Sequence, residues 1–200
     1  MEANNKIQSN KPDLPVIPFV SAAIWEQWLE QNHIISKGIW LQFYKKGSGI
    51  ASVTYAEALD VALCYGWIDA QLKSIDELCY KQRFTPRRPK SIWSKRNIEH
   101  IARLTAEARM KPAGLKQVEA AKADGRWEQA YDSPRSMTLS PDFVLELQKD
   151  KKALMFYESL SKTNKYAIAW RIQTAKRPET REKRVKEILE MLARQEKFHM

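Results

Sequence analysis

Residues Val53–Phe84, VTYAEALDVALCYGWIDAQLKSIDELCYKQRF, decide the fold that we expect for this chain. The segment TYAE has the form of a capping box, in which the Thr54 hydroxyl accepts a hydrogen bond from the Glu57 amide while the Glu57 side chain accepts one from the Thr54 amide. Apolar residues fill most of the surface of the following turns, and Gly66 is suited to a left-handed helix end. The sequence therefore predicts a buried helix that begins at Thr54 and ends at Gly66.

Two short alternating segments follow this helix, IDAQLKS and LCYKQRF, and they are joined around Asp76 and Glu77. Alternating segments of this length on either side of a polar turn are typical of an antiparallel hairpin. In the second segment Lys81 and Arg83 are two residues apart, so their side chains point to the same face of the strand. The hairpin is therefore expected to present two cations side by side.

The flanking sequence predicts an α+β fold class. The segment GIWLQFYKK alternates like a strand with one buried face, so we place it beside the hairpin in a small antiparallel sheet of about three strands. Ser21 is a suitable N-cap for an amphipathic helix that ends near Asn32. The sheet is expected to pack with helices and to be followed by a helical C-terminal region, with helix starts at Pro112, Ser140, Ser161 and Pro178.

This pattern predicts a division of the chain into three parts. Residues 1–13 are polar and lack periodicity, so we expect a disordered N-terminal tail. Residues 14–110 are expected to form the α+β core, which carries a basic strand-loop-helix site. Residues 111–200 are expected to form a helical region packed on that core.

The composition excludes several classes of protein. A chain of 200 residues with 44% hydrophobic content is large enough to bury a core. The longest uncharged run near the N-terminus, residues 14–25, contains two prolines and is too short to span a bilayer or to act as a secretion signal. We therefore predict no membrane insertion and a cytoplasmic location.

Neither the cysteines nor the histidines have the spacing of a metal site. Cys64 and Cys79 form no C-x-x-C pair, and in the cytoplasm they are expected to be reduced thiols. The three histidines are scattered, at His33, His100 and His199. The sequence therefore predicts no metal and no cofactor.

A basic segment with interspersed aromatic residues is the strongest candidate site. The chain has a net charge of +10, much of it between Lys73 and Lys111. Cations on the predicted strand are followed by two exposed arginines in a proline-bounded loop and then by the N-terminus of a helix capped by Ser94, where N–H groups attract anions. We therefore predict a small anionic ligand bound by Trp67, Asp69, Lys81, Arg83, Arg87, Arg88, Trp93, Ser94, Lys95 and Arg96.

Other interpretations use the same segment. The cations could be a solvated edge of the fold, with Trp93 in the core. An enzyme acting on a phosphorylated or nucleotide-like substrate would use Asp69 as its acid or base, but Asp69 could instead pair with Lys81 or Arg83. Aromatic rings among cations also suit single-stranded nucleic acid, although no nucleic-acid-binding motif is present and we expect little such binding at physiological salt. We find no catalytic motif in the sequence and favour a binding protein over an enzyme.

The last predicted helix carries an apolar stripe at helical spacing, formed by Val185, Ile188, Leu189 and Leu192. We expect the stripe to dock within the same chain, on the segment YAIAWRI, which offers Ile168, Trp170 and Ile172, and on the sheet behind it. A helix on a membrane surface is the competing interpretation, but several glutamates dilute its basic face.

The sequence as a whole resembles the family called bacteriocin-protection, YdeI or OmpD-associated. The resemblance covers nearly everything from about Pro18 onward. It rests on GIWLQFYKKGSG, VTYAEALDVALCYGWIDAQLKSIDELCYKQRFTPRRPKSIWSKRN, ARMKPAGLKQVEAAKADGRW and YAIAWRIQTAKRPETREKRVKEILEMLARQEK.

The resemblance implies a bacterial protein that takes part in protection against bacteriocins or antimicrobial peptides, or in envelope stress, and it implies no particular reaction. A basic protein is a poor direct binder of cationic peptides because like charges repel each other. We therefore expect protection to be indirect, through an anionic ligand or through a protein partner that the sequence does not identify.

Overall fold

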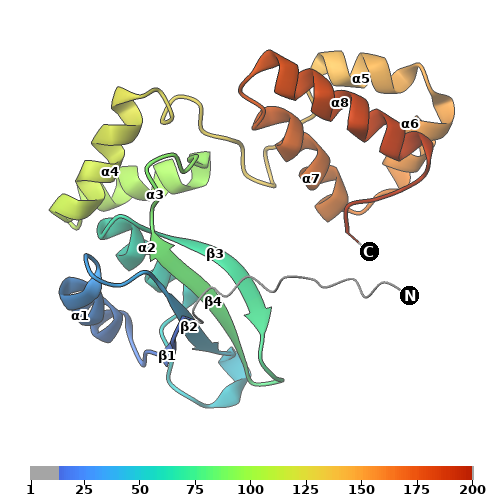
Figure 1. Cartoon of the computed structure of the whole chain (residues 1–200). Helices are drawn as coiled ribbons and strands as arrows, with labels where there is room; N and C mark the ends of the chain where they lie inside the picture. The colour runs from blue at the N-terminus through green and yellow to red at the C-terminus, as the bar shows by residue number, and fades with distance from the viewer. Residues whose placement is uncertain (1–13, 200) are drawn as a thin grey trace, which may run out of the picture. The chain divides into compact units, whose positions relative to one another are not determined.

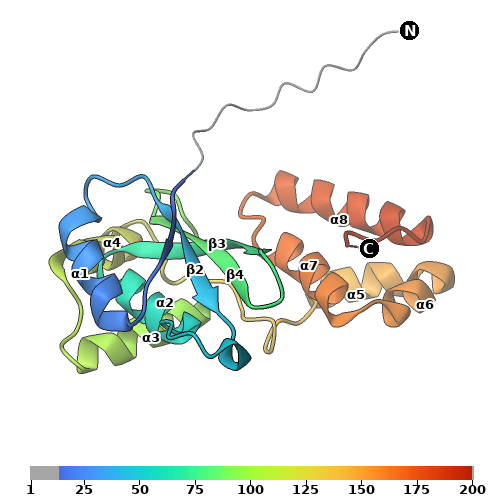
Figure 2. The same cartoon turned by 90° about the horizontal axis from the view of Figure 1, so that it is seen from below.

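The computed structural model describes residues 14–199, and these form two compact units that are described separately (Figures 1 and 2). The first unit comprises residues 14–91 and 100–124, and the second comprises residues 92–99 and 125–199. The predicted tail at residues 1–13 lies outside the described residues. The predicted domain boundary near residue 110 stays a prediction, and the structure places residues 100–124 with the first unit.

The first unit contains a four-stranded sheet with the order β1-β2-β4-β3. The β2, β4 and β3 strands pair in antiparallel fashion as the sequence predicts, whereas β1 pairs with β2 in parallel and was not predicted. Its three residues are followed by a short loop and are too few for an alternating pattern to be recognised. The strands are β1 (Val16–Pro18), β2 (Ile39–Tyr44), β3 (Trp67–Ser74) and β4 (Cys79–Pro86).

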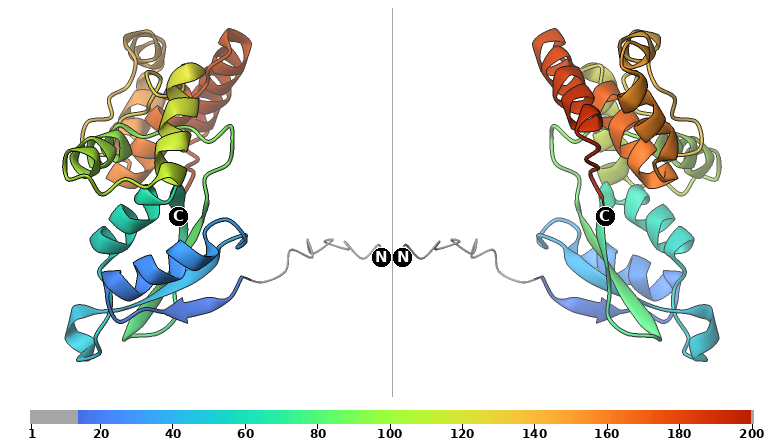
Figure 3. Two further views of the ribbon diagram at one scale, coloured as in Figure 1. Left: turned by 90° about the vertical axis from the view of Figure 1, so that its left-hand side faces the viewer. Right: turned by 90° about the vertical axis from the view of Figure 1, so that its right-hand side faces the viewer.

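Helices α1 (Ala22–Asn32) and α2 (Tyr55–Cys64) cover one face of this sheet (Figures 1 and 3). The ring centre of Trp25 on α1 lies 5.9 Å from that of Phe84 on β4, and both side chains are fully buried. The predicted capping box of α2 is present, and Gly66 has a φ of 73° just beyond the helix end. The capping box therefore sets the start of α2, while the packing of Trp25 on Phe84 holds α1 on the sheet.

The β3–β4 hairpin is closed by Asp76, whose Oδ1 accepts hydrogen bonds from the backbone N–H groups of Leu78 and Cys79. These two bonds lower the pKa of the Asp76 carboxyl. The strands are not in continuous register, because a bulge falls between Asp69 and Leu72. A bulge moves all later side chains of its strand to the opposite face, and this shift decides the position of Lys73.

Two further helices complete the first unit: α3 (Lys95–Ala106), whose residues from His100 onward belong to it, and α4 (Pro112–Ala123). Asp60 of α2 holds α3 through hydrogen bonds from His100 and Arg103. Helix α4 packs directly on the end of α2, where Gly114 is buried. The short 3-10 turn η1 (Lys46–Ser48) follows β2.

The second unit is a group of helices around its own apolar core (Figure 2). Ser161 caps α7 and Pro178 opens α8, as predicted, but α6 was not predicted. The helices are α5 (Pro141–Gln148), α6 (Lys151–Ser159), α7 (Lys162–Gln173) and α8 (Pro178–Ala193).

The apolar stripe of α8 docks within the same chain, as the sequence predicts. Ile188 and Leu192 are buried in one cluster with Ile168 and Ile172 of α7. The remaining buried members of this cluster come from the helical unit, not from the predicted sheet layer. Trp170 is not among them and instead packs edge-on against Tyr131, with ring centres 6.1 Å apart. Within residues 14–199, no helix combines the length and apolar character that a membrane span requires.

Candidate functional site

The sheet face opposite α1 and α2 carries a group of cations around one tryptophan, which we call the basic face: Trp40, Lys73, Lys81 and Arg83. Trp40 of β2 is directly paired with Arg83 of β4, so both side chains are on the same side of the sheet. Lys81 shares that side because it is two residues from Arg83. The predicted juxtaposition of Lys81 and Arg83 is thus part of a larger basic surface.

Lys73 joins this surface through the bulge in β3. After the bulge Lys73 pairs directly with Lys81, so two ammonium groups are on neighbouring strands at the same position. Each Nζ lies 5.1 Å from the centre of the Trp40 ring. Cation–π attraction offsets part of the repulsion, but like charges directly opposite each other destabilise a sheet. An anion between the two lysines would remove this repulsion.

A cavity of about 660 Å³ opens on the basic face. Its lining includes four cationic side chains, and none of its described lining residues is acidic. The Nε atom of Arg83 is buried and has no hydrogen-bond partner among residues 14–199. The described lining residues are Leu14, Lys37, Trp40, Ile68, Ala70, Gln71, Lys73, Arg83, Thr85, Pro86, Arg88 and Ser91.

Two of the predicted site residues, Trp67 and Asp69, lie on the helix-covered face. Trp67 is 1% exposed, and its indole N–H donates to the backbone oxygen of His33. Asp69 Oδ2 accepts hydrogen bonds from the Tyr55 hydroxyl (2.9 Å) and the Gln82 amide (2.8 Å). The alternative pairing of Asp69 with Lys81 or Arg83 is therefore wrong, because the pleat directs Asp69 to the opposite side of the sheet.

The two arginines of the proline-bounded loop have different surroundings. Arg88 is exposed and lines the cavity, as the sequence prediction requires. Arg87 is 5% exposed, so the expectation that both side chains are exposed is wrong for Arg87. Its backbone N–H also donates to the Gly66 oxygen at 3.0 Å, which fixes the chain where β4 ends.

The last four predicted residues belong to the second unit, and none of them is among the described lining residues of the cavity. Trp93 is buried and packs on Trp127 with ring centres 5.0 Å apart, while Ser94 accepts a hydrogen bond from the Asn97 N–H and so caps α3 as predicted. Lys95 forms an ion pair of 2.7 Å with Asp132. The side chain of Arg96 is exposed.

Among the lining residues that were not predicted, three carry a cation or an aromatic ring: Lys37, Trp40 and Lys73. In the alternating segment GIWLQFYKK, the Trp40 side chain points to the face of the strand opposite to that of Ile39 and Leu41. An aromatic residue on the outer face of a predicted strand could therefore have been recognised as a candidate site residue. The position of Lys73 could not be derived from alternation, because the bulge reverses the face.

Neither the Cys64 thiol nor a cluster of metal-binding side chains among residues 14–199 forms a competing site. Burial raises the pKa of the Cys64 thiol to about 11, so this thiol is protonated and poorly nucleophilic at neutral pH. Among residues 14–199, no three histidine, cysteine, aspartate or glutamate side chains are grouped so that they could hold a metal ion.

Comparison with known families divides the chain into two parts. Residues 17–117, half of the chain, match the family described as Domain of unknown function (DUF8412), and this match includes the basic face. Residues 136–195 match the family described as Bacteriocin-protection, YdeI or OmpD-Associated, so the predicted resemblance is confirmed within the helical second unit. Searches among curated proteins and among solved structures gave no match. The chain therefore belongs to the DUF8412 family through residues 17–117 and carries a bacteriocin-protection, YdeI or OmpD-associated domain at residues 136–195.

Proposed function

We propose that the basic face binds a small anionic ligand. The observation that carries this proposal is the direct pairing of Lys73 with Lys81, each over Trp40, with no acidic side chain in the described lining of the cavity. A pair of like charges reduces the stability of a sheet, so its presence is most simply explained by a ligand that neutralises it.

The side chains suit a phosphate ester or a carboxylate. Lysine ammonium groups act as compact charges, and Arg83 adds donors in a planar fork that matches the oxygens of either anion. The cavity of about 660 Å³ has the size of a metabolite site and exceeds what a single inorganic ion would fill. The ligand is thus an organic anion with room for an apolar part beside Trp40.

We place this binding activity in a bacterial protein of stress or envelope protection, in accordance with the description of the family matched at residues 136–195. With its net charge of +10 the chain repels cationic peptides, so protection would act through the anionic ligand rather than through direct capture. A cytoplasmic location and a non-enzymatic role are part of the same proposal. Asp69 does not favour an enzyme in this cavity, because its carboxylate is hydrogen-bonded on the other face of the sheet.

Isothermal titration calorimetry with inorganic phosphate, pyrophosphate, citrate and nucleoside monophosphates tests the proposal. At least one organic anion should bind to the unsubstituted chain. Lys81→Gln should weaken that binding about tenfold or more, because a hydrogen bond between charged groups contributes roughly 1.5–3 kcal/mol. The matched control is Lys46→Gln, which removes an exposed lysine of η1 and should leave affinity unchanged.

Two outcomes contradict the proposal. Equal affinity of the Lys81→Gln and Lys46→Gln variants would show that the anion binds elsewhere or through net charge alone. Tight binding of a single-stranded oligonucleotide at about 0.15 M salt, with a steep logarithmic salt dependence, would favour a nucleic-acid-binding surface instead.

A further inference from the structure

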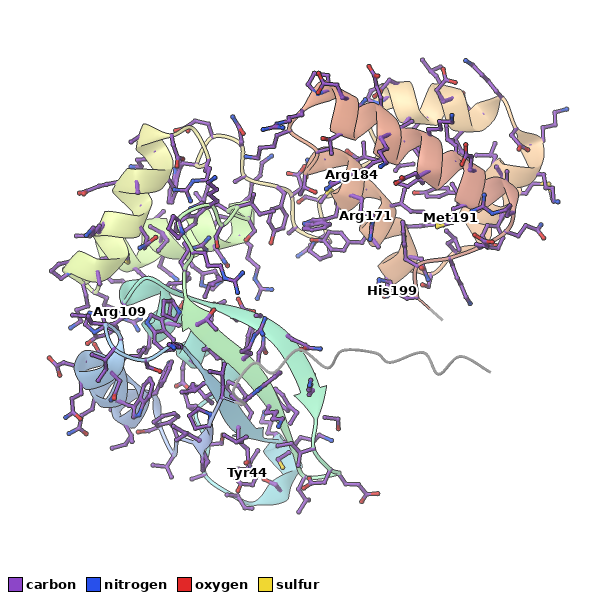
Figure 4. The ribbon with its side chains drawn as sticks, viewed as in Figure 1. Tyr44, Arg109, Arg171, Arg184, Met191 and His199 are labelled. Carbon is purple, nitrogen blue, oxygen red and sulfur yellow. The ribbon has the colours of Figure 1, made fainter. Side chains whose placement is uncertain are left out.

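The cavity on the basic face extends along β4 between two ends. Lys73, paired with Lys81, marks one end. This end lies toward Tyr44, which is labelled in Figure 4 and pairs with β4 two residues before Lys81. Thr85 lines the other end, four residues beyond Lys81, so the two ends are about 14 Å apart along the strand. A ligand that contacts both ends must therefore be elongated.

Two further cations, Lys37 and Arg88, lie at the Thr85 end. Lys37 precedes Gly38, and a Cβ atom on Gly38 would lie 2.7 Å from the Thr85 Cγ2 atom, so the backbone here is directly against Thr85. Arg88 comes two residues after Pro86, the last residue of β4. The side chains of Lys37 and Arg88 are exposed, and both line the cavity. The cavity thus has cations at both ends.

Apolar side chains lie between the two groups of cations. Ile68 of β3 pairs directly with Thr85, and Trp40 of β2 pairs directly with Arg83. Directly paired residues point to the same side of a sheet, and both apolar side chains line the cavity. They offer no charge to an anion and favour a hydrocarbon part of the ligand.

The cations of the cavity are not neutralised by the chain itself. Those that line it form no ion pair with an acidic side chain among residues 14–199: Lys37, Lys73, Arg83 and Arg88. Elsewhere in the same unit, by contrast, Lys111 pairs with Glu26 at 3.2 Å. The buried Nε atom of Arg83 also lacks a hydrogen-bond partner within the described residues. Unpaired cations at two separate places require two separate negative charges.

We propose that the basic face binds an elongated organic dianion, whose two anionic groups are joined by an apolar spacer. One anionic group is bound by Lys73, Lys81 and Arg83. The other is bound by Lys37 and Arg88. This ligand class rests on the proposed binding of an anion at the same site. A single phosphate or a compact polyanion does not belong to it, because either would leave one group of cations without a partner.

Isothermal titration calorimetry with sebacate, decanoate and succinate tests this ligand class. Extended sebacate is comparable in length to the distance between the two ends, and decanoate has the same carbon chain without the second carboxylate. We expect sebacate to bind about tenfold or more tightly than decanoate, because its second carboxylate binds in an intramolecular step. Succinate is too short to reach both ends and should also bind more weakly than sebacate.

Variants of the two ends should differ in their effects. Arg88→Gln removes a cation from the Thr85 end only, so it should weaken sebacate binding about tenfold and leave decanoate binding nearly unchanged. Lys73→Gln removes a cation from the end with more positive charge and should weaken the binding of both compounds. The matched control is Lys46→Gln, which removes an exposed lysine of η1 and should change neither affinity.

Three outcomes contradict the proposal in different ways. If neither these carboxylates nor the other organic anions bind, the proposed function itself is wrong. If decanoate or succinate binds to the unsubstituted chain as tightly as sebacate, anion binding stands, but the two-ended ligand is wrong. If Arg88→Gln and Lys46→Gln weaken sebacate binding equally, the second carboxylate responds to net charge and is not bound by Arg88.

Discussion

Gly114 of α4 lies directly against the backbone carbonyl groups at the end of α2. A Cβ atom on Gly114 would overlap with the carbonyl oxygen of Cys64 and lie 2.8 Å from that of Leu63. The Cys64 oxygen also accepts a hydrogen bond from the Lys111 N–H, which leads into α4. This close approach holds α4 on α2 and leaves no space for any side chain at position 114.

We therefore expect Gly114→Ala to lower the free energy of unfolding by about 1–3 kcal/mol, as overpacking does in other cores. Urea denaturation measures the change. The control is Gly47→Ala, because a Cβ atom there has no heavy atom within 4 Å, and its effect should stay within about 0.5 kcal/mol. Alanine is the better helix former, so a Gly114→Ala variant that is more stable than the unsubstituted chain would contradict this account of the packing.

The ionisation of Asp60 makes the free energy of unfolding depend on pH. Burial disfavours the charged carboxylate, but hydrogen bonds from Arg103 and His100 outweigh burial and hold the pKa of Asp60 below its usual value of 3.8. A lowered pKa in the folded state stabilises it fully above the usual value, and this contribution is lost as the pH falls through 3.8 toward the folded-state pKa.

Asp60→Asn should accordingly lower the free energy of unfolding by about 1–2 kcal/mol near pH 7, less than for a fully buried pair because Arg103 is partly exposed. The difference between the variant and the unsubstituted chain should shrink as the pH falls below about 4. Urea denaturation across this pH range measures it, with Asp150→Asn as a comparison for an exposed aspartate that caps α6. A difference that stays constant down to acid pH would show that ionisation of Asp60 does not contribute.

The sequence predicts those features of the fold that depend on local chemistry. The capping groups of α1, α2, α3 and α7 are correct because a serine or threonine hydroxyl bonds to a backbone N–H three residues later. Helix α6 was missed because only Lys149 and Asp150 separate it from α5, so the two apolar patterns merge. Strand β1 was missed because its pairing with β2 is a tertiary contact.

The candidate site was predictable only in part for a similar reason. Lys81 and Arg83 share a face through simple alternation along one strand. The position of Trp40 depends on which strands are neighbours, and that of Lys73 depends on the bulge after Asp69. Arg87 and Arg88 are adjacent in the same loop, but Arg87 is buried and Arg88 is exposed. This difference results from tertiary packing, so no sequence pattern predicts it.

A charge reversal in the Lys73–Lys81 pair should change stability and anion binding in opposite directions. Lys73→Glu replaces like charges with opposite charges at directly paired positions, so it should raise the free energy of unfolding by about 0.2–1 kcal/mol at low salt. The same change should abolish binding of the anion. Thermal unfolding at low and at about 1 M salt, where screening removes the gain, measures the first effect, and calorimetry measures the second. Lys46→Glu is the control for net charge, and an equal gain in that variant would rule out the cross-strand explanation.

Arg87 and Arg88 should respond differently to truncation. Arg87→Ala removes a side chain that is 5% exposed and should destabilise the chain by more than 1 kcal/mol. Arg88→Ala changes an exposed side chain and should leave stability within about 0.5 kcal/mol, while weakening anion binding at the cavity that it lines. Chemical denaturation and calorimetry on both variants check these outcomes. If both substitutions leave stability unchanged, the burial of Arg87 does not contribute to the fold.

Leu192 tests whether α8 is an integral part of the second unit. Its side chain is 0% exposed and belongs to the cluster that also includes Phe143, Ile168 and Ile172. Leu192→Ala creates a cavity in this cluster and should cost about 2–5 kcal/mol, because the lost transfer free energy and the cavity both contribute. Leu145→Ala is the matched control, since that leucine on α5 is 63% exposed and should tolerate the same truncation. Hydrogen exchange of the α5 and α7 amides in each variant measures the loss of stability in the helices that share this cluster. Unchanged protection of these helices in Leu192→Ala would show that α8 is an appendage rather than a part of the core, and would restore the alternative in which its apolar stripe binds a membrane surface.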